Sequence, residues 1–397
     1  MTGDADSASD AVGQPPPKRL KIAVLNRVFS PTGGGAERYS IALVEQLASR
    51  HEIHVFAQQI DHHWPGVVYH RVPQLLKRPR WINQLWYATA TWWATRRGFD
   101  VIHSHENTWH GQVQTVHVLP IKHNLFHGRE GLDRTLRWLK VVTSPRLLVH
   151  LWLERARYAA HPGRVLVATS STLQRVMVQT HPRTAPMLRV LTPGVVAVHG
   201  KATPTDRHHA RQSLGLPLIQ PCILFVANDF QKKGLKTVLD ALAQLRDDTK
   251  LAVVGNIAHA TGFTAQIKSL KLESRVFFLG ALKDITPAYQ AADCLAHPTL
   301  QDTFAMVVLE AMAHALPVVV SDEAHCGIAG LLTHADNALI LKNPRNPIKL
   351  ATQLQSILQN PQIRDRLSQG AVAFAAGHLW QQAAQAQEAM YFEANRN

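Results

Sequence analysis

The chain has 397 residues, long enough for two sizeable hydrophobic cores, and its apolar fraction of 46% is ordinary for a globular protein. No segment offers the roughly 18 to 20 uninterrupted apolar residues that a membrane-spanning helix needs. The formal net charge of +14 predicts an anionic partner: a nucleotide, a nucleic acid or an anionic membrane surface. We expect no nucleic-acid partner, because the sequence has no zinc-finger spacing, RNP string or basic zipper.

Residues 1–19 are predicted to form a disordered leader. This segment carries Asp4, Asp6 and Asp10 but no apolar core, so it does not resemble a signal peptide, and Pro15–Pro17 close it. The three cysteines have apolar neighbours and no metal-binding spacing, which is typical of buried thiols in a reducing cytosol. We therefore expect a cytoplasmic protein.

From Lys21 onward, short β-strand patterns alternate with helical stretches. The strand candidates in the first half are Lys21–Leu25, Ile53–Ala57, Val67–Val72, Val101–His105 and Val165–Ser170. The same rhythm restarts at Cys222–Ala227, and this alternation predicts parallel sheets with both faces covered. We expect two α/β domains, over 20–198 and 218–378, joined by a polar linker at 199–217.

A glycine cluster, Gly33–Gly35, lies between the first predicted strand and a helical stretch that follows Arg38. A strand, a glycine loop and a helix in this order can cradle a phosphate. The loop is neither a G-x-G-x-x-G string nor a Walker loop, so neither a dinucleotide nor an ATP motor is indicated. The alternative is a flexible turn, which is common for glycine triplets.

Four histidines crowd the region after the fourth predicted strand. They are His103, His105, His110 and His117. Metal binding is possible in principle, but no carboxylate or cysteine set completes a site, so we expect no metal.

The stretch Lys77–Arg97 combines five cations with five Trp or Tyr residues and has no acid. Aromatic rings and cations together are typical of a membrane interface, where the cations meet anionic lipid. The alternative, that several of these tryptophans are core residues, is equally supported. A second basic and apolar stretch runs over 122–157, and there Trp152 is expected to lie in the core.

In the second domain, Lys232 and Lys233 lie between the predicted strand Cys222–Ala227 and a predicted helix at Thr237–Leu245. Lysines on such a loop, just before a helix, are well placed to hold a diphosphate. The alternative is a pair of solvated loop lysines.

The segment Gln301–Ser321 is the most informative part of the sequence. Asp302 and Glu310 lie eight positions apart and flank an apolar run with helical spacing. Asp302 is predicted to cap this helix, so that the free N–H groups of the first turn face an anion. Glu310, about two turns further on, would reach another part of an extended ligand such as a nucleotide-sugar. The alternative is an ordinary amphipathic helix with a capping Asp and a solvated Glu.

This segment resembles the carboxylate-x7-carboxylate motif of the family-four retaining glycosyltransferases with the GT-B fold. The motif usually reads Glu-x-Phe-Gly-x-x-x-x-Glu-Ala-Met-Ala-x-Gly-x-Pro-Val-Val, and here Asp302, Ala305 and Ala315 replace one Glu and two Gly. The strings that begin at Asp229 and His297 are most similar to those of the lipopolysaccharide core glucosyltransferases. The resemblance implies two Rossmann-like α/β/α domains that face each other across a cleft.

The resemblance also implies a site built from both domains. The implied catalytic residues are Asp302, Lys233 and His117, and the implied donor-binding residues are Gly34, Gly35, Glu37, Lys232, Gly234, Gly280, Phe304, Ala305, Met306 and Glu310. In this interpretation the lysines hold the diphosphate, Glu310 holds the ribose, and Asp302 and His117 hold the sugar. Asn228 stands near the place of an arginine that many members carry, and Lys232 is expected to supply that charge.

The activity implied is metal-independent, retaining transfer of a hexose, from UDP-glucose or a related UDP-hexose, to a lipid-linked glycan such as lipopolysaccharide core. The resemblance implies no cofactor. It also implies a protein that is bound peripherally to the inner face of the cytoplasmic membrane. The segment 379–397, with Trp380, is expected to cross back to the first domain as a helix. Two alternatives remain: a catalytically silent GT-B protein that binds a nucleotide-sugar or a membrane, and a phosphorylase-like or epimerase-type GT-B enzyme.

Overall fold

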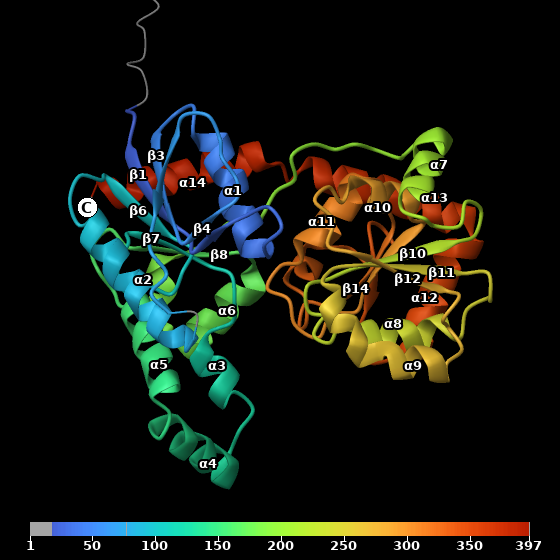
Figure 1. The fold of residues 1–397 in the computed structure, drawn as a ribbon, viewed down its shortest axis with the longest axis horizontal. Coiled ribbons are helices and arrows are strands. Elements are labelled where there is room, and N and C mark those ends of the chain that lie inside the picture. Colours follow the sequence, from blue (N-terminus) through green and yellow to red (C-terminus); the bar gives the residue numbers. More distant parts are fainter. Residues whose placement is uncertain (1–17, 77, 397) are drawn as a thin grey trace, which may run out of the picture.

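The structure is a computed structural model that describes residues 18–76 and 78–396. Most of the predicted leader, and Lys77 of the basic aromatic stretch, lie outside the described residues. Figure 1 shows two lobes side by side, each built on its own sheet.

The first lobe contains a seven-stranded parallel sheet in the order β5-β3-β1-β6-β7-β8-β9. Its strands are β1 Lys21–Leu25, β3 Glu52–Ala57, β5 Val67–Arg71, β6 Val101–Ser104, β7 Val113–Val116, β8 Val165–Ala168 and β9 Leu188–Val190. A small parallel pair, β2 Val28–Phe29 and β4 Gln59–Ile60, lies beside it. The central strand β1 is hydrogen-bonded on both edges and covered on both faces, which explains its continuous apolar sequence.

Helices cover both faces of this sheet. They are α1 Gly35–Leu47, α2 Arg80–Thr95, α3 Ile121–Phe126, α4 Gly131–Val142, α5 Pro145–Arg157, α6 Ser171–Thr180, the 3-10 segment Pro182–Met187 and, from the end of the chain, α14 Trp380–Asn395. Residues of α1 and α14 share one core with the sheet, whereas Tyr87 of α2 packs in a separate core with Leu25 and Phe56. In Figure 1, α4 lies at the far lower end of this lobe, away from the sheet.

The second lobe contains a six-stranded parallel sheet in the order β12-β11-β10-β13-β14-β15. Its strands are β10 Cys222–Val226, β11 Lys250–Val254, β12 Val276–Gly280, β13 Cys294–His297, β14 Val318–Ser321 and β15 Leu339–Leu341. Its helices are α8 Leu235–Leu242, α9 Thr264–Ser269, α10 Thr286–Ala291, α11 Met306–Ala313, α12 Pro347–Gln359 and α13 Pro361–Ala376, with 3-10 segments at Ile257–Phe263 and Gly327–Leu331. These two sheets confirm the predicted class of two Rossmann-like α/β/α domains.

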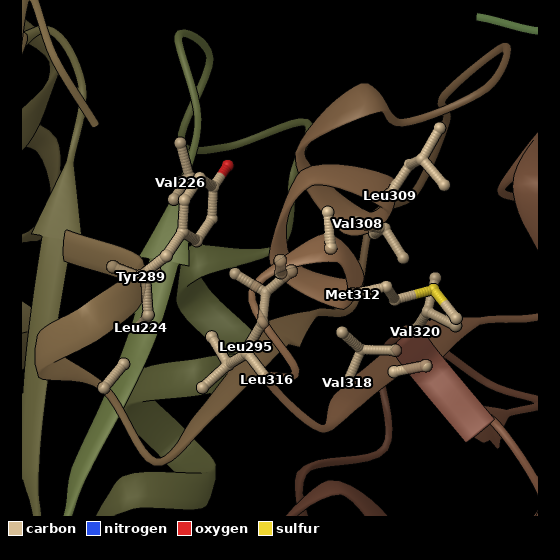
Figure 2. Packing of buried hydrophobic residues seen from close by; sticks show 14 of the residues in the cluster. Leu224, Val226, Tyr289, Leu295, Val308, Leu309, Met312, Leu316, Val318 and Val320 are labelled. Atoms are coloured by element: carbon tan, nitrogen blue, oxygen red, sulfur yellow. The ribbon is translucent and has the colours of Figure 1, made fainter. Parts of the chain in front are cut away.

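Two apolar cores lie on opposite faces of the second sheet. One involves α8, α9 and α12, and the other involves α10, α11 and α13. Figure 2 shows the latter core, in which Val308 and Met312 of α11 pack against Leu295 of β13 and Val320 of β14. Burial of this helix face fixes the position of α11, whose first residues reach the cleft between the lobes.

The chain passes between the lobes twice, and the two crossings touch. The N–H of Val195 donates to the carbonyl of His378 (2.9 Å), and the N–H of Trp380 donates to the carbonyl of Val195 (3.0 Å). A Cβ at Gly194 would lie 2.5 Å from the Trp380 nitrogen, so only glycine fits there. Helix α14 then packs on α1, with Trp380 buried edge-on to Tyr39 (ring centroids 5.3 Å apart), so the end of the chain returns to the first lobe.

The predicted linker at 199–217 is only partly irregular, because it contains helix α7 Pro204–Ser213. A capping box between Thr203 and Asp206 begins this helix. Arg207 and Arg211 then pair with Asp293, which follows α10, at 2.5 and 3.1 Å. Helix α7 therefore belongs to the second lobe, and the irregular connection is shorter than the sequence indicated.

Candidate active site

A cavity of about 800 Å³ lies between the two lobes. The first lobe contributes the Gly33–Arg38 segment and His117, and the second contributes the β10–α8 loop, Ala281–Thr286 and Asp302–Val307. Such a volume falls within the range of roughly 300 to 1,000 Å³ that is usual for small-molecule sites. The cavity also lies at the carboxyl ends of β10 and β11, the usual place for ligands in parallel α/β sheets.

The amino ends of two helices meet at this cavity. Helix α1 begins at Gly35 and helix α11 at Met306, and a Cβ on Gly35 would lie only 3.8 Å from the Met306 sulfur. Met306 packs against cores of both lobes. The first N–H groups of a helix lack intrahelical partners and carry partial positive charge, so two such ends on one cavity favour an anionic ligand.

Asp302 is not the cap of α11, so that prediction is wrong. The helix begins at Met306 and is preceded by Ala305, whose φ of 76° places it in the left-handed region. This left-handed residue turns the chain after Asp302 and separates its carboxylate from the helix by three residues. The Oδ1 of Asp302 instead accepts a hydrogen bond from the N–H of Phe304 at 3.2 Å.

The other carboxylate oxygen of Asp302 is paired with Lys233. The Lys233 Nζ lies 2.5 Å from Oδ2 of Asp302 and donates to the carbonyl of Gln301 at 3.1 Å. Burial would raise the pKa of Asp302, but the neighbouring His297 and the positive charge of Lys233 outweigh burial and hold that pKa well below its usual range. The cavity therefore carries a fixed carboxylate and a cation that neutralise each other.

His297 completes this cluster at the end of β13. Its Nε2 makes a long polar contact with Oδ2 of Asp302, at 3.4 Å, and its Nδ1 has no hydrogen-bond partner among the described residues. Burial lowers the pKa of His297, so its ring is neutral near pH 7. It lines the cavity with unsatisfied hydrogen-bonding capacity.

Glu310 also faces the cavity, but both of its oxygens have partners. Oε2 accepts a hydrogen bond from the hydroxyl of Tyr289 at 2.7 Å, and Oε1 forms an ion pair with Nη2 of Arg38, from α1 of the opposite lobe. Burial and the neighbouring charge of Glu310 raise the pKa of Tyr289 well above its usual value, so the phenol stays a donor. Figure 2 shows Tyr289 at the edge of the core beneath α11.

His117 lines the cavity from the first lobe, just after β7. Its Nε2 lies 2.9 Å from Nδ1 of His105, and its ring stands edge-on to Tyr39. Burial lowers the pKa of His117 to about 3, so the ring is neutral near pH 7. Its carbonyl accepts a hydrogen bond from Thr303 Oγ1 of the second lobe at 2.7 Å, which joins the lobes beside Asp302.

The predicted donor-binding residues divide into two groups. Those that line the cavity are Gly34, Gly35, Glu37, Phe304, Ala305, Met306 and Glu310. Glu37 folds against the glycine loop, where a Cβ on Gly33 would lie 2.9 Å from its Cβ, and burial raises the pKa of Glu37. Lys232, Gly234 and Gly280 are not among the lining residues.

Backbone geometry explains these three exceptions. Gly234 has a φ of 85°, and a Cβ there would lie 2.1 Å from the carbonyl oxygen of Pro298, so it permits close packing before α8. The carbonyl of Lys232 accepts from the N–H of Leu300 (2.9 Å), which ties its loop to the segment after β13. Gly280 ends β12, and the next residues, Ala281 and Leu282, are the ones that line the cavity.

A second cavity, of about 360 Å³, lies on the other side of the Asp302 segment. Asp302 and Thr303 line both cavities. The remaining polar lining residues are His123, His127, Thr172, Arg175, Gln179, Gln301, Glu323 and His325. Sequence reasoning did not find this cavity, because its residues come from both lobes and share no motif.

Among the clustered histidines, His103, His105 and His117 hydrogen-bond to neighbouring side chains, whereas neither ring nitrogen of His110 has a hydrogen-bond partner among the described residues. His103 hydrogen-bonds to Tyr391 and Thr115, both at 2.7 Å. Over residues 18–76 and 78–396, no three or more His, Cys, Asp or Glu side chains are grouped as metal ligands would be. In the same ranges, no helix has both the length and the hydropathy to cross a bilayer.

The basic stretches are more exposed than the sequence suggested. In α2, Tyr87 is buried, but Trp93 is 62% exposed and Arg96 stacks on its ring at 3.7 Å. Trp152 was expected in the core, and this is wrong: it is 53% exposed on α5. Leu132, Leu136, Trp138 and Leu139 of α4 are exposed as well, because this helix buries only Val141.

Two protein-family models match the chain. The model described as Glycosyltransferase Family 4 matches residues 33–199, and the model described as Glycosyl transferases group 1 matches residues 206–373. The lipopolysaccharide glucosyltransferase WaaG of Escherichia coli (strain K12) is 30% identical over 204 residues, which cover 50% of this chain and 54% of that protein. A D-inositol 3-phosphate glycosyltransferase of Corynebacterium diphtheriae is 28% identical over 242 residues, covering 58% and 56%. The aligned part thus spans just over half the length of these relatives.

Solved structures match over more of the chain. The crystal structure of WaaG, a glycosyltransferase involved in lipopolysaccharide biosynthesis, has a TM-score of 0.80 at 22% identity and covers 92% of this chain and 98% of that one. Anabaena HepE, in complex with UDP and glucose, has a TM-score of 0.74 at 21% identity and covers 94% and 98%. At such identities the likeness shows the fold, and it confirms the GT-B arrangement.

Proposed function

Because the chain belongs to the family-four glycosyltransferases with the GT-B fold, we propose that it moves a hexose from a nucleotide-sugar to a lipid-linked glycan. UDP-glucose or a related UDP-hexose is the proposed donor, and HepE, with UDP and glucose bound, supports this choice. One observation carries the proposal: Lys233, Asp302, Glu310 and the amino ends of α1 and α11 converge on a single cavity.

An extended donor suits the order of groups along this cavity. The diphosphate lies by the two helix ends and Lys233, where N–H groups and an ammonium attract it. The ribose hydroxyls reach Glu310, and the base lies against Ala281 and Leu282. The sugar ring then faces Asp302 and His117.

The chemistry follows from the charge that develops on the leaving group. As the anomeric C–O bond to the β-phosphate breaks, the diphosphate gains negative charge, which fixed positive groups stabilise without a metal. Asp302, held 2.5 Å from Lys233, is placed as an electrostatic partner rather than as a nucleophile. The acceptor oxygen therefore attacks on the face that the leaving group vacates, its proton passes to the departing phosphate oxygen, and configuration is retained.

The second cavity is the proposed acceptor site. It meets the donor cavity at Asp302 and Thr303, so an acceptor hydroxyl there approaches the sugar end of the donor. Its amide, carboxylate, guanidinium and imidazole groups suit a ligand rich in hydroxyls. Its volume of about 360 Å³ accommodates the end of a glycan rather than a whole lipid.

Peripheral membrane binding is part of the same proposal. Helix α4 exposes Leu132, Leu136 and Leu139 together with Arg134 and Lys140, a combination that inserts apolar side chains while the cations meet anionic headgroups. This surface replaces Lys77–Arg97 as the main proposed contact, although Trp93 of that stretch is also exposed. Such a contact brings the enzyme to a lipid-linked acceptor.

A donor screen tests the proposal. Thermal unfolding is followed with UDP-, GDP- and ADP-sugars, and transfer from the best donor is then detected by mass spectrometry, with a lipid-linked glycan and with inositol 3-phosphate as acceptors. We expect stabilisation by a UDP-hexose and transfer to the glycan. Binding without turnover, in both the natural chain and Asp302→Glu, would favour the catalytically silent alternative. Donor phosphorolysis or epimerisation without any acceptor would favour the third possibility.

A further inference from the structure

Arg38 links the two lobes inside the donor cavity. It lies in the first turns of α1, and its Nη2 pairs with Oε1 of Glu310 on α11, 272 positions away in the chain. Both side chains line the same cavity as Lys233. The pair is therefore a cross-lobe contact located where a ligand has to bind.

The proposed function requires Glu310 for another purpose. Ribose hydroxyls need carboxylate oxygens as acceptors, yet Oε2 already accepts from Tyr289 (2.7 Å) and Oε1 is held by Arg38. Tyr289 is buried in the core under α11 and cannot leave, whereas the side chain of Arg38 is one-third exposed. Of the two partners of Glu310, Arg38 is therefore the one that an arriving ribose can displace.

A displaced Arg38 stays next to the place of the diphosphate. It is anchored in the first turns of α1, whose free N–H groups face the same cavity. The second lobe is short of cations at that point: Asn228 lines the cavity, and the side chain of Lys232 does not. Lys283 lines it too, but from the exposed loop after β12, on the base side.

We propose that Arg38 exchanges partners when the donor binds, leaving Glu310 to the ribose and turning to the diphosphate. The clamp on the leaving group is then shared between the lobes, with Lys233 on one side and Arg38 on the other. A guanidinium suits this position because its planar array of N–H groups binds two phosphate oxygens at once. This inference rests on the proposed nucleotide-sugar donor.

The exchange predicts opposite effects on two related ligands. In Arg38→Met, uridine, which needs only Glu310, loses its competitor and binds at least as tightly as before. UDP loses a charge-assisted contact and binds roughly tenfold to a hundredfold more weakly. The affinity of Arg38→Lys for UDP lies between that of the natural chain and that of Arg38→Met. Calorimetric titration of each variant with uridine and with UDP measures both effects.

The control variant is Arg50→Met, which removes an arginine that pairs with Glu388 of α14, outside the cavity. We expect it to bind both ligands like the natural chain. An equal loss of uridine and UDP affinity in Arg38→Met would mean that Arg38 only supports Glu310, and unchanged UDP affinity would exclude it from the clamp. Either result would overturn the proposed exchange of Arg38 and would leave the proposed function standing. If the natural chain binds none of UDP, GDP and ADP, the proposed function falls and the exchange falls with it.

Discussion

At the scale of single residues, the site is defined by two pairs of opposite charge that line the cavity. Lys233 pairs with Asp302, and Arg38 pairs with Glu310. Each pair joins a cation suited to a diphosphate with a carboxylate suited to hydroxyls. We propose that donor binding exchanges one set of charge partners for another, so that both carboxylates and both cations keep a partner in either state.

The Asp302→Asn variant tests this exchange at the Lys233 pair. Without the carboxylate, Lys233 is free to bind phosphate, so UDP binds as tightly as before or more tightly. Transfer falls about a hundredfold or more, because the sugar and the cation lose their fixed partner. The matched control is Asp240→Asn, which breaks an exposed pair with Lys236 outside the cavity and leaves both values unchanged. Full transfer by Asp302→Asn would remove this residue from the mechanism.

Single residues also mark the limit of prediction from sequence. The motif spacing placed Lys233, Asp302, Glu310 and Phe304 correctly at one cavity. It did not reveal the pairing of Arg38 with Glu310, because residues 272 positions apart meet only after both lobes have formed. The cap assigned to Asp302 was wrong, because the left-handed turn at Ala305 is not coded by a glycine.

At the scale of elements, buried strands were the easiest features to predict. The bounds of β1, Lys21–Leu25, agree with the expected range, since a strand covered on both faces must be apolar throughout. The surface helices were harder. Helix α4 exposes most of its apolar residues, and Trp152 of α5, which was expected in the core, is exposed as well.

The segment that contains α11 includes two alanines where the resemblance expects glycine. Ala315, just after the helix, has a φ of 57°, a conformation that costs an alanine about 1 to 2 kcal/mol. We expect Ala315→Gly to raise the free energy of unfolding by up to about 1 kcal/mol, after the larger unfolded-state entropy of glycine is subtracted. The matched control, Ala311→Gly, lies inside the helix and should lower the free energy of unfolding by about 1 kcal/mol. Urea unfolding distinguishes the two, and equal destabilisation would contradict the assigned geometry.

Helix α4 is the element on which membrane binding depends. We expect the double variant Leu132→Ser, Leu136→Ser to co-sediment with anionic vesicles several-fold less than the natural chain, because insertion of each exposed leucine is lost. Ile219→Ser, at a still more exposed position on the second lobe, is the control and should bind normally. Salt should weaken binding of the natural chain. Equal binding to neutral vesicles, or no effect of the serines, would count against this surface.

At the scale of the whole molecule, buried neutral histidines make stability depend on pH. Burial lowers the pKa of His103 and His117 to about 3 and that of His110 and His314 to about 4. Between these values and the unfolded value of about 6.5, the unfolded chain binds more protons, so stability falls as pH decreases. The pKa of Asp302 is lowered in the folded protein, so protonation of this carboxylate decreases the free energy of unfolding further at still lower pH.

The free energy of unfolding should therefore decrease from pH 7 to pH 5, by up to about 1.4 kcal/mol per pH unit for each such histidine. His110→Gln should make this dependence shallower, because one proton-linked group is removed. Urea unfolding at several pH values measures the slope. A stability that is flat between pH 7 and pH 5 would show that these rings are not held neutral by burial.

The fold of the whole molecule could be predicted because its two series of alternating strands and helices, and its C-terminal helix, can each be recognised from short stretches of sequence. Helix α7 was missed as part of the second lobe, since its polar sequence hides the contacts of Arg207 and Arg211 with Asp293. The second cavity was also missed, because it exists only between the lobes. Short sequence motifs do not reveal features that form only where the two lobes meet.

The central claim is that the cavity between the lobes holds a nucleotide-sugar by its diphosphate, with Lys233 as a principal contact. Calorimetric titration of the best donor from the screen into the natural chain, Lys233→Met and Lys236→Met tests this claim most directly. We predict binding to the natural chain, a loss of roughly tenfold or more in Lys233→Met, and normal binding in Lys236→Met, whose lysine lies on α8 outside the cavity. Undiminished affinity in Lys233→Met would contradict the claim.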